Sequence, residues 1–276
     1  MIKWEHSIFA LPFALTATVL AAHGWPRANV LLWIVVCMVS ARSAAMGFNR
    51  WADADLDGAN PRTAMRALPA GDLGRGFVLG FVIVASAVFV ISAAMLNHLT
   101  LLLAPVALFV VLAYSYMKRI TRWSHLVLGL ALGIAPAAAW IAVRGTLDPR
   151  ILVLTGAVLL WVGGFDILYA CQDFEHDRKS GLYSVPQAFG LDTAFTIARV
   201  MHVAMICLLI WLLHLFHLGS VAIAGVALVA ALLFYEHSLV RPGDLRRMNA
   251  AFFTLNGIIS VVLFASIAAD LALHKV

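Results

Sequence analysis

The amino-acid sequence predicts an all-α polytopic membrane protein, and two observations carry that prediction. Of the 276 residues, 63% are hydrophobic and only 12% are charged, with a mean hydropathy of +0.95. Soluble domains are roughly half apolar and a quarter charged, so a soluble enzyme, a nucleic-acid-binding protein and a disordered chain are excluded. The second observation is the length of the apolar runs, because a helix needs about 20 such residues to cross a bilayer.

Nine apolar runs follow one another along the chain, which we expect to form a single transmembrane domain over 1–276. They lie at 8–22, 30–48, 76–96, 99–116, 124–143, 151–170, 193–213, 219–235 and 250–273. The first eight form a weak repeat of four helices, 1–116 and 124–235, to which the ninth helix is added. The repeat is indicated by the acidic residues, since Asp173 follows Asp53 by 120 residues and Asp177 follows Asp57 by the same interval.

The basic residues predict how these spans are oriented. With the amino terminus on the cytoplasmic side, thirteen of the 19 Lys and Arg residues fall in cytoplasmic segments, and only Arg27, Arg144, Arg150 and Lys275 fall outside. That distribution follows the positive-inside rule. We therefore expect a multi-pass protein of the inner (cytoplasmic) membrane, surrounded by the lipid bilayer. The two longest connections, 49–75 and 171–192, then face the cytoplasm together, and long polar connections in a compact protein are usually functional.

Acidic residues gather in these two connections. Asn49, Asp53 and Asp57 are four residues apart, so on a helix they share one face. Asp173 and Asp177 repeat this spacing in the second connection. Carboxylate and amide oxygens are ligands that Mg²⁺ prefers, with phosphate completing its shell. The pattern predicts two facing walls of one site for a metal-bridged diphosphate. A solvated helix end neutralised by nearby arginines is the simpler alternative.

Basic residues flank both acidic motifs. Arg62 and Arg66 follow the first motif, Lys179 follows the second, and Lys118 and Arg119 end the fourth span. Because arginine and lysine bind phosphate groups, we expect these five side chains to contact the diphosphate. The segment around Lys118 is explained equally well as the positive, aromatic end of a membrane span.

Two charged residues lie within spans, seven residues before the acidic motifs. Arg42 precedes Asn49 by seven residues, and Asp166 precedes Asp173 by the same interval. A charge inside a membrane span is costly and usually functional, so we expect Arg42 and Asp166 to line the same cavity. The alternative is that they pair with each other or extend to the membrane interface.

Taken together, these motifs resemble the UbiA superfamily of membrane prenyltransferases. The resemblance rests on Asn49-x3-Asp53-x3-Asp57 and Asp173-x3-Asp177, and it covers the whole chain. Further segments that agree lie at 5–12, 62–71, 116–123, 165–169 and 235–240. They are most similar to the UbiA-like branch labelled 4-hydroxybenzoate polyprenyltransferase, some members of which (the MqnP type) serve menaquinone synthesis. Many members have Asn-Asp at the start of the first motif, whereas this chain has Asn49-Arg50.

The resemblance implies nine helices around a central cavity that opens to lipid and is capped by the two cytoplasmic Asp-rich loops. It implies Mg²⁺ and diphosphate binding by Asn49 and the four aspartates, which are also the candidate catalytic residues. Arg42 is the implied partner of a carboxylate on the aromatic acceptor. Tyr114 and Tyr169 are the candidate aromatic residues for stabilising an allylic cation through their ring faces.

The implied activity is Mg²⁺-dependent transfer of a polyprenyl group from polyprenyl diphosphate to a hydroxylated aromatic acid. That acid would be 4-hydroxybenzoate or 1,4-dihydroxy-6-naphthoate, for ubiquinone or menaquinone biosynthesis. Two alternatives remain at this point: a related enzyme with a haem or other lipid acceptor, and a divalent-cation transporter. A transporter should place acidic residues through the bilayer and on both sides of it, whereas here they gather on one side.

Overall fold

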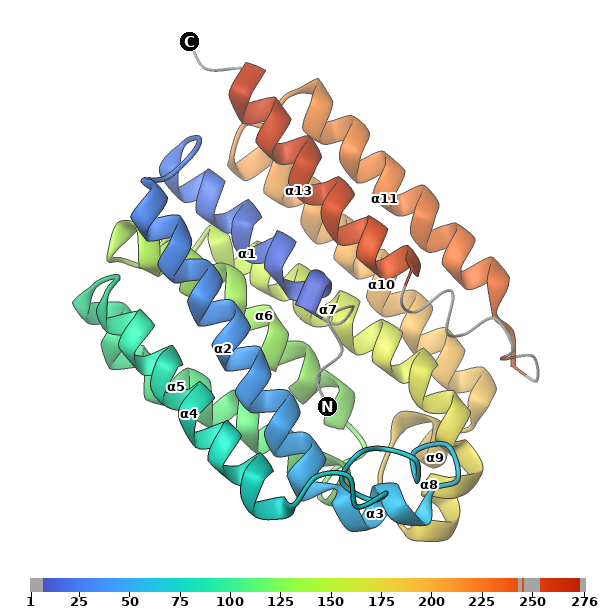
Figure 1. Cartoon of the computed structure of the whole chain (residues 1–276). Coiled ribbons are helices and arrows are strands. Elements are labelled where there is room, and N and C mark those ends of the chain that lie inside the picture. Colours follow the sequence, from blue (N-terminus) through green and yellow to red (C-terminus); the bar gives the residue numbers. More distant parts are fainter. Residues whose placement is uncertain (1–6, 243–244, 246–253, 274–276) are drawn as a thin grey trace.

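The computed structural model describes residues 7–242, 245 and 254–273, and these residues form helices and connections with no β-strand (Figure 1). The elements are α1 (Ser7–Ala22), α2 (Ala28–Ala52), α3 (Ala54–Ala59), α4 (Arg75–Ala94), α5 (His98–Ala113), the 3₁₀ helix η2 (Tyr114–Arg119), α6 (Ser124–Arg144), α7 (Ile151–Ala170), the 3₁₀ helix η3 (Cys171–Asp173), α8 (Phe174–Ser180), α9 (Val185–Phe189), α10 (Leu191–Leu215), α11 (Ser220–Leu239) and α13 (Asn256–Leu273).

Eight helical segments in the described part of the chain are long and apolar enough to cross a membrane. They include α2, α4, α6, α10, α11 and α13, together with the segments that contain α5 and α7. α1 occupies the place of the first expected span and is a shorter apolar helix. The prediction of an all-α polytopic membrane protein is confirmed, and the count of nine spans stays a prediction. The amino-terminal residues 1–6 and the start of the ninth predicted span, 250–253, lie outside the described residues.

The main apolar core lies between α1, α6, α7, α10, α11 and α13. Its largest fully buried side chains include Phe13, Trp161, Leu154 and Leu209. Figure 1 shows α7 in the middle of the molecule, with α10, α11 and α13 on one side of it and α2, α4 and α5 on the other. The second group has only a small cluster of buried apolar residues between α2, α4 and α5, which leaves room for a cavity next to α2.

Close packing of α6 against α7 depends on two glycines. A Cβ at Gly129 would lie 2.3 Å from the carbonyl oxygen of Leu159, and a Cβ at Gly133 would lie 2.9 Å from that of Thr155. Small residues allow the backbones of membrane helices to approach in this way. The middle of α6 is therefore held directly against the first half of α7.

Both acidic motifs lie at helix ends at the same end of the molecule, around α3, α8 and α9 (Figure 1). The first motif does not lie on one continuous helix, because α2 ends at Ala52 and α3 begins at Ala54. Asp53 at this break has φ −98° and ψ 6°, and Asp173 before α8 has φ −99° and ψ 7°. The matching breaks agree with the repeat of 1–116 and 124–235, which stays a prediction.

Candidate active site

A cavity of about 950 Å³ lies between α2, α5, α6 and α7, under the two acidic connections. The predicted site residues that line it are Arg42, Asn49, Asp53, Asp57, Arg62, Arg66, Tyr114, Lys118, Asp166, Tyr169, Asp173 and Asp177. Deeper in the cavity the walls are apolar, with contributions from Cys37, Phe89, Leu132 and Ala135. The structure therefore brings the two acidic motifs together over one hollow that has a polar end and a hydrocarbon-like interior.

Asp53 is buried at the junction of α2 and α3 and is held by two cations. The Nζ of Lys118 donates to its Oδ2 at 2.6 Å, and the Nη2 of Arg119 donates to its Oδ1 at 2.8 Å. The side-chain amide of Asn49 adds a hydrogen bond at 3.1 Å. Arg119 does not line the cavity in the described structure, and it acts on the site through Asp53.

Asp57 is also buried, and the cations that pair with it belong to the first connection itself. The Nη1 of Arg66 donates to both of its carboxylate oxygens at 2.7 Å. Arg50 lies 3.7 Å from the same carboxylate. Arg50 therefore supplies further positive charge to the first acidic motif.

Asp173 connects the second motif to the first. Arg62 donates to both of its carboxylate oxygens, through Nε at 2.8 Å and through Nη2, and the amide of Asn60 donates at 3.0 Å. Arg62 also donates to the hydroxyl of Tyr169 at 3.0 Å. Burial by itself would lower the pKa of Arg62, but the hydrogen bonds and charge of Asp173 outweigh it and raise the pKa. The guanidinium is therefore a firmly charged bridge between the two connections.

The other residues of the second connection are arranged differently. Asp177 lines the cavity and makes no ion pair with a described Lys or Arg. Lys179 is exposed and does not line the cavity. The reason is the helical geometry of α8, since a residue two positions after Asp177 points to nearly the opposite face of the helix.

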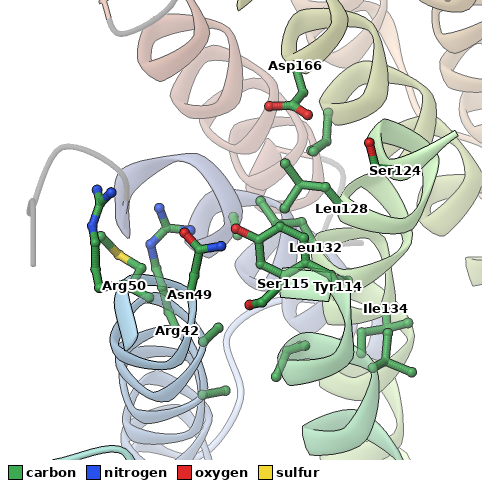
Figure 2. A pocket seen from close by; sticks show the side chains of 18 of the residues that line it. Arg42, Asn49, Arg50, Tyr114, Ser115, Ser124, Leu128, Leu132, Ile134 and Asp166 are labelled. Atoms are coloured by element: carbon green, nitrogen blue, oxygen red, sulfur yellow. The ribbon is translucent and has the colours of Figure 1, made fainter. Parts of the chain in front are cut away.

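Arg42 projects from α2 into the cavity, two helical turns below Asn49. Its Nε is buried and has no hydrogen-bond partner in the described structure. Figure 2 shows Arg42 and Asn49 reaching from α2 toward Tyr114, with Asp166 entering the same space from another side. The alternative in which Arg42 and Asp166 pair with each other is not what the structure shows, because Asp166 is bonded to His125 at 2.7 Å.

Sequence reasoning missed two residues of the site, Asn60 and His125. Asn60 is buried and bonds to Asp173 across 113 residues of chain. Its position between Asp57 and Arg62, in the middle of the first connection, could have marked it as a site residue. His125 lines the cavity at the start of α6, and it has no neighbouring motif that would have marked it.

The donor set suits a metal that arrives with a phosphate. Among the described residues, no three His, Cys, Asp or Glu side chains are close enough to hold a metal ion by themselves. Mg²⁺ in proteins is commonly bound through one or two carboxylates plus substrate phosphates rather than by an all-protein cage. The hard oxygens of Asn49 and the four aspartates, all of which line the cavity, fit that mode of binding.

Comparison with known proteins gives the family. The sequence profile described as the UbiA prenyltransferase family matches residues 10–258. This chain belongs to the UbiA prenyltransferase family. It is 34% identical over 251 residues to the 4-hydroxybenzoate octaprenyltransferase of Vibrio cholerae serotype O1, covering 91% of this chain and 88% of the relative. It is 31% identical over 265 residues to that of Photobacterium profundum, covering 95% and 91%.

Solved structures of UbiA proteins have the same fold. The apo structure of a UbiA homologue from Aeropyrum pernix K1 superimposes with a TM-score of 0.89 at 32% identity, over 98% of this chain and 99% of that one. A UbiA homologue from Archaeoglobus fulgidus, bound to DMAPP and Mg²⁺, gives a TM-score of 0.74 at 20% identity, with 97% of each chain covered. As a member of the UbiA family, this protein is a multi-pass membrane prenyltransferase, and its cavity is the candidate active site.

Proposed function

We propose that this enzyme transfers a polyprenyl group from a polyprenyl diphosphate to a hydroxylated aromatic acid in respiratory quinone biosynthesis. One observation carries the proposal: the cavity combines a polar end rich in carboxylates and cations with a deeper guanidinium, that of Arg42, whose buried Nε has no hydrogen-bond partner in the described structure. The first group suits a diphosphate and the second suits the carboxylate of an acid. The relatives named 4-hydroxybenzoate octaprenyltransferase support this choice of acceptor. The second candidate acceptor is 1,4-dihydroxy-6-naphthoate.

In this proposal the diphosphate binds among Arg62, Arg66 and Lys118, which now hold carboxylates. Phosphate oxygens accept the same charge-assisted hydrogen bonds as carboxylate oxygens, so each cation exchanges one anionic partner for another. Asn49, Asp53, Asp57, Asp173 and Asp177 would hold Mg²⁺ beside it. When bound, the ion would neutralise charge that develops on the departing diphosphate. The Mg²⁺ and DMAPP bound to the Archaeoglobus fulgidus homologue support this assignment.

The prenyl chain and the aromatic acid would occupy the inner part of the cavity. Apolar walls exclude water, which protects an allylic cation from hydrolysis. The rings of Tyr114 and Tyr169 lie along the same cavity and can stabilise that cation through their faces. Arg42 would bind the carboxylate of the acid and so place the electron-rich ring next to the cation.

We further propose that the polar end of the cavity faces the cytoplasm, with the protein in the inner membrane. The excess of Lys and Arg on that side supports this orientation. A water-soluble diphosphate would then leave on the cytoplasmic side, and the prenylated product would stay in the lipid.

The experiment that tests the function incubates the purified enzyme with a polyprenyl diphosphate and each acid, and identifies products by mass. We expect a prenylated aromatic acid with at least one acceptor, no product with chelator, and recovery of product when Mg²⁺ is restored. Transfer that is unaffected by chelator would contradict the metal assignment. Ion flux in proteoliposomes without any prenyl transfer would contradict the enzymatic proposal itself.

Arg42 provides a sharper test of the acceptor. We expect Arg42→Gln to raise KM for the aromatic acid by about 10- to 100-fold, which is the value of one or two hydrogen bonds to a charged group. KM for the polyprenyl diphosphate should change little. Arg199→Gln is the matched control, because Arg199 also lies within a membrane helix but is exposed and outside the cavity lining. Equal effects of both variants on the acid would refute the role of Arg42.

A further inference from the structure

One pair of side chains in the cavity has no part in the functions assigned above. His125 begins α6 and Asp166 lies near the end of α7, and the Nδ1 of His125 lies 2.7 Å from the Oδ2 of Asp166. The other ring nitrogen, Nε2, receives a hydrogen bond from the backbone N–H of Val185 at 3.2 Å. Both side chains line the cavity.

These two bonds determine the protonation of the histidine. A backbone N–H can only donate, so the Nε2 of His125 must be the unprotonated, accepting nitrogen. The proton of the ring is then on Nδ1, where it is donated to Asp166, and the imidazole is neutral. The carboxylate of Asp166 is therefore held in one orientation by an uncharged hydrogen-bond donor.

The other carboxylates of the cavity have a different environment. Asp53, Asp57 and Asp173 are each bound to Arg or Lys, and Asp177 lies with them at the polar end. Asp166 is two helical turns below Asp173 on α7, a separation of about 10 Å along the helix. It thus lies at the depth of Arg42, which is likewise seven residues below its own motif, and away from the groups that bind the diphosphate.

We propose that Asp166 accepts the proton that the aromatic ring releases during prenyl transfer, with His125 as its positioning residue. This inference rests on the proposed function. As the carbon–oxygen bond of the donor breaks, its electron pair leaves with the diphosphate. A ring carbon next to the hydroxyl then supplies two electrons to form the new carbon–carbon bond. The C–H bond at that carbon breaks, its electrons restore the aromatic ring, and the proton moves to the free oxygen of Asp166.

The position of Asp166 matches this role better than that of any motif aspartate. A carboxylate already bonded to a guanidinium or to Mg²⁺ is a weak base, because its negative charge is neutralised. A carboxylate with a neutral donor retains its basicity while its orientation is fixed. Arg42 holding the carboxylate of the acid would leave the ring itself to face Asp166 across the cavity, as the arrangement of these residues in Figure 2 allows.

The test uses Asp166→Asn, which keeps the size of the side chain and removes the base, with an acceptor deuterated next to its hydroxyl. We expect kcat to fall by about 100-fold, as for loss of a general base, with both KM values near those of the unaltered enzyme. Proton loss should then limit the rate, so the deuterated acceptor should react more slowly in the variant but not in the unaltered enzyme.

His125 supplies the second arm of the test. His125→Asn retains an N–H near the position of Nδ1 that can donate to Asp166, whereas His125→Leu does not, so we expect the asparagine variant to recover most of the activity lost in the leucine variant. Both variants remove the accepting nitrogen that Val185 uses. Equal losses in the two variants, with weaker binding of the donor and no isotope effect, would mean that the pair serves only to anchor the segment around Val185, which overturns the proposal.

The two levels of inference can fail separately. If the unaltered enzyme forms no prenylated acid with any acceptor, the proposed function fails, and the role of Asp166 fails with it. If the unaltered enzyme is active and Asp166→Asn shows an undiminished kcat without an isotope effect, only the role of Asp166 is overturned.

Discussion

The two acidic connections have the same carboxylate spacing but different sources of positive charge. In the first connection, Asp53 and Asp57 are only 3% and 6% exposed. Each of these carboxylates has two cationic partners. In the second connection, Asp173 is held by Arg62, which belongs to the first connection. The basic residues of the second connection itself, Arg178 and Lys179, are exposed.

The aspartates of the two connections recur at an interval of 120 residues, whereas the basic residues that pair with them do not recur in this way. Every Lys or Arg that pairs with a motif aspartate comes from the first half of the described chain: Arg50, Arg62, Arg66, Lys118 and Arg119. The first half therefore contains an assembled set of cations, and the second half adds carboxylates to it. The backbone reinforces this contact, because the N–H of Tyr183 donates to the carbonyl of Lys118 at 2.8 Å.

The largest effects should come from neutralising one carboxylate in each connection. We expect Asp53→Asn and Asp173→Asn each to lower kcat/KM by about 100- to 1000-fold, the range for loss of one preorganised electrostatic group. The comparison predicts that only Asp53→Asn also lowers the melting temperature markedly, because it leaves two cations without their shared partner. Activity assays and thermal unfolding in detergent measure the two effects. Equal melting temperatures would show that the two connections are energetically alike.

Arg62 should give the next largest effect, since it joins the connections. Arg62→Gln removes the paired hydrogen bonds to Asp173, and we expect KM for polyprenyl diphosphate to rise by about 10- to 100-fold. Arg62→Lys should recover only part of this loss, because lysine has the charge but not the planar pair of donors. A lysine variant equal to the unaltered enzyme would mean that charge alone matters at this position.

Lys179 should give the smallest effect and serves as the control for Arg62. The sequence predicts that it contacts the diphosphate, but the structure places it on the outer face of α8. We expect Lys179→Gln to change kcat/KM by no more than about twofold, which corresponds to a few tenths of a kcal/mol. A loss comparable to that of Arg62→Gln would show that α8 turns toward the cavity when the donor binds.

Much of the fold follows from local sequence properties. Composition and the apolar runs predict membrane helices, and the runs at 124–143 and 151–170 agree with α6 and α7 to within a residue at each end. The spacing of the aspartates predicts that Asp53 and Asp57 share a side, and a backbone hydrogen bond from Asp57 to Asp53 at 2.7 Å keeps that turn in spite of the break. The break itself was not predictable, because no proline or glycine stands at Asp53.

The candidate site was less accessible from sequence because its partners come from distant segments. Arg62 and Asp173 are 111 residues apart and His125 and Asp166 are 41 apart, so no local period relates them. Arg42 was recognisable because a charge in a membrane span is conspicuous. The outward direction of Lys179 was in principle readable, since residues two apart on a helix point to opposite faces.

The glycines between α6 and α7 also determine how accurately His125 meets Asp166. Gly129 lies one turn after His125, and its α-carbon hydrogens face the Leu159 carbonyl at a distance that leaves no space for a methyl group. Gly163 lies three residues before Asp166, where a Cβ would come within 3.4 Å of the carbonyl oxygen of His125. Sliding one helix along the other would separate the imidazole from the carboxylate. If His125 and Asp166 act as we propose, a substitution at Gly129, where an added Cβ would lie 2.3 Å from backbone, should change turnover without touching any substrate.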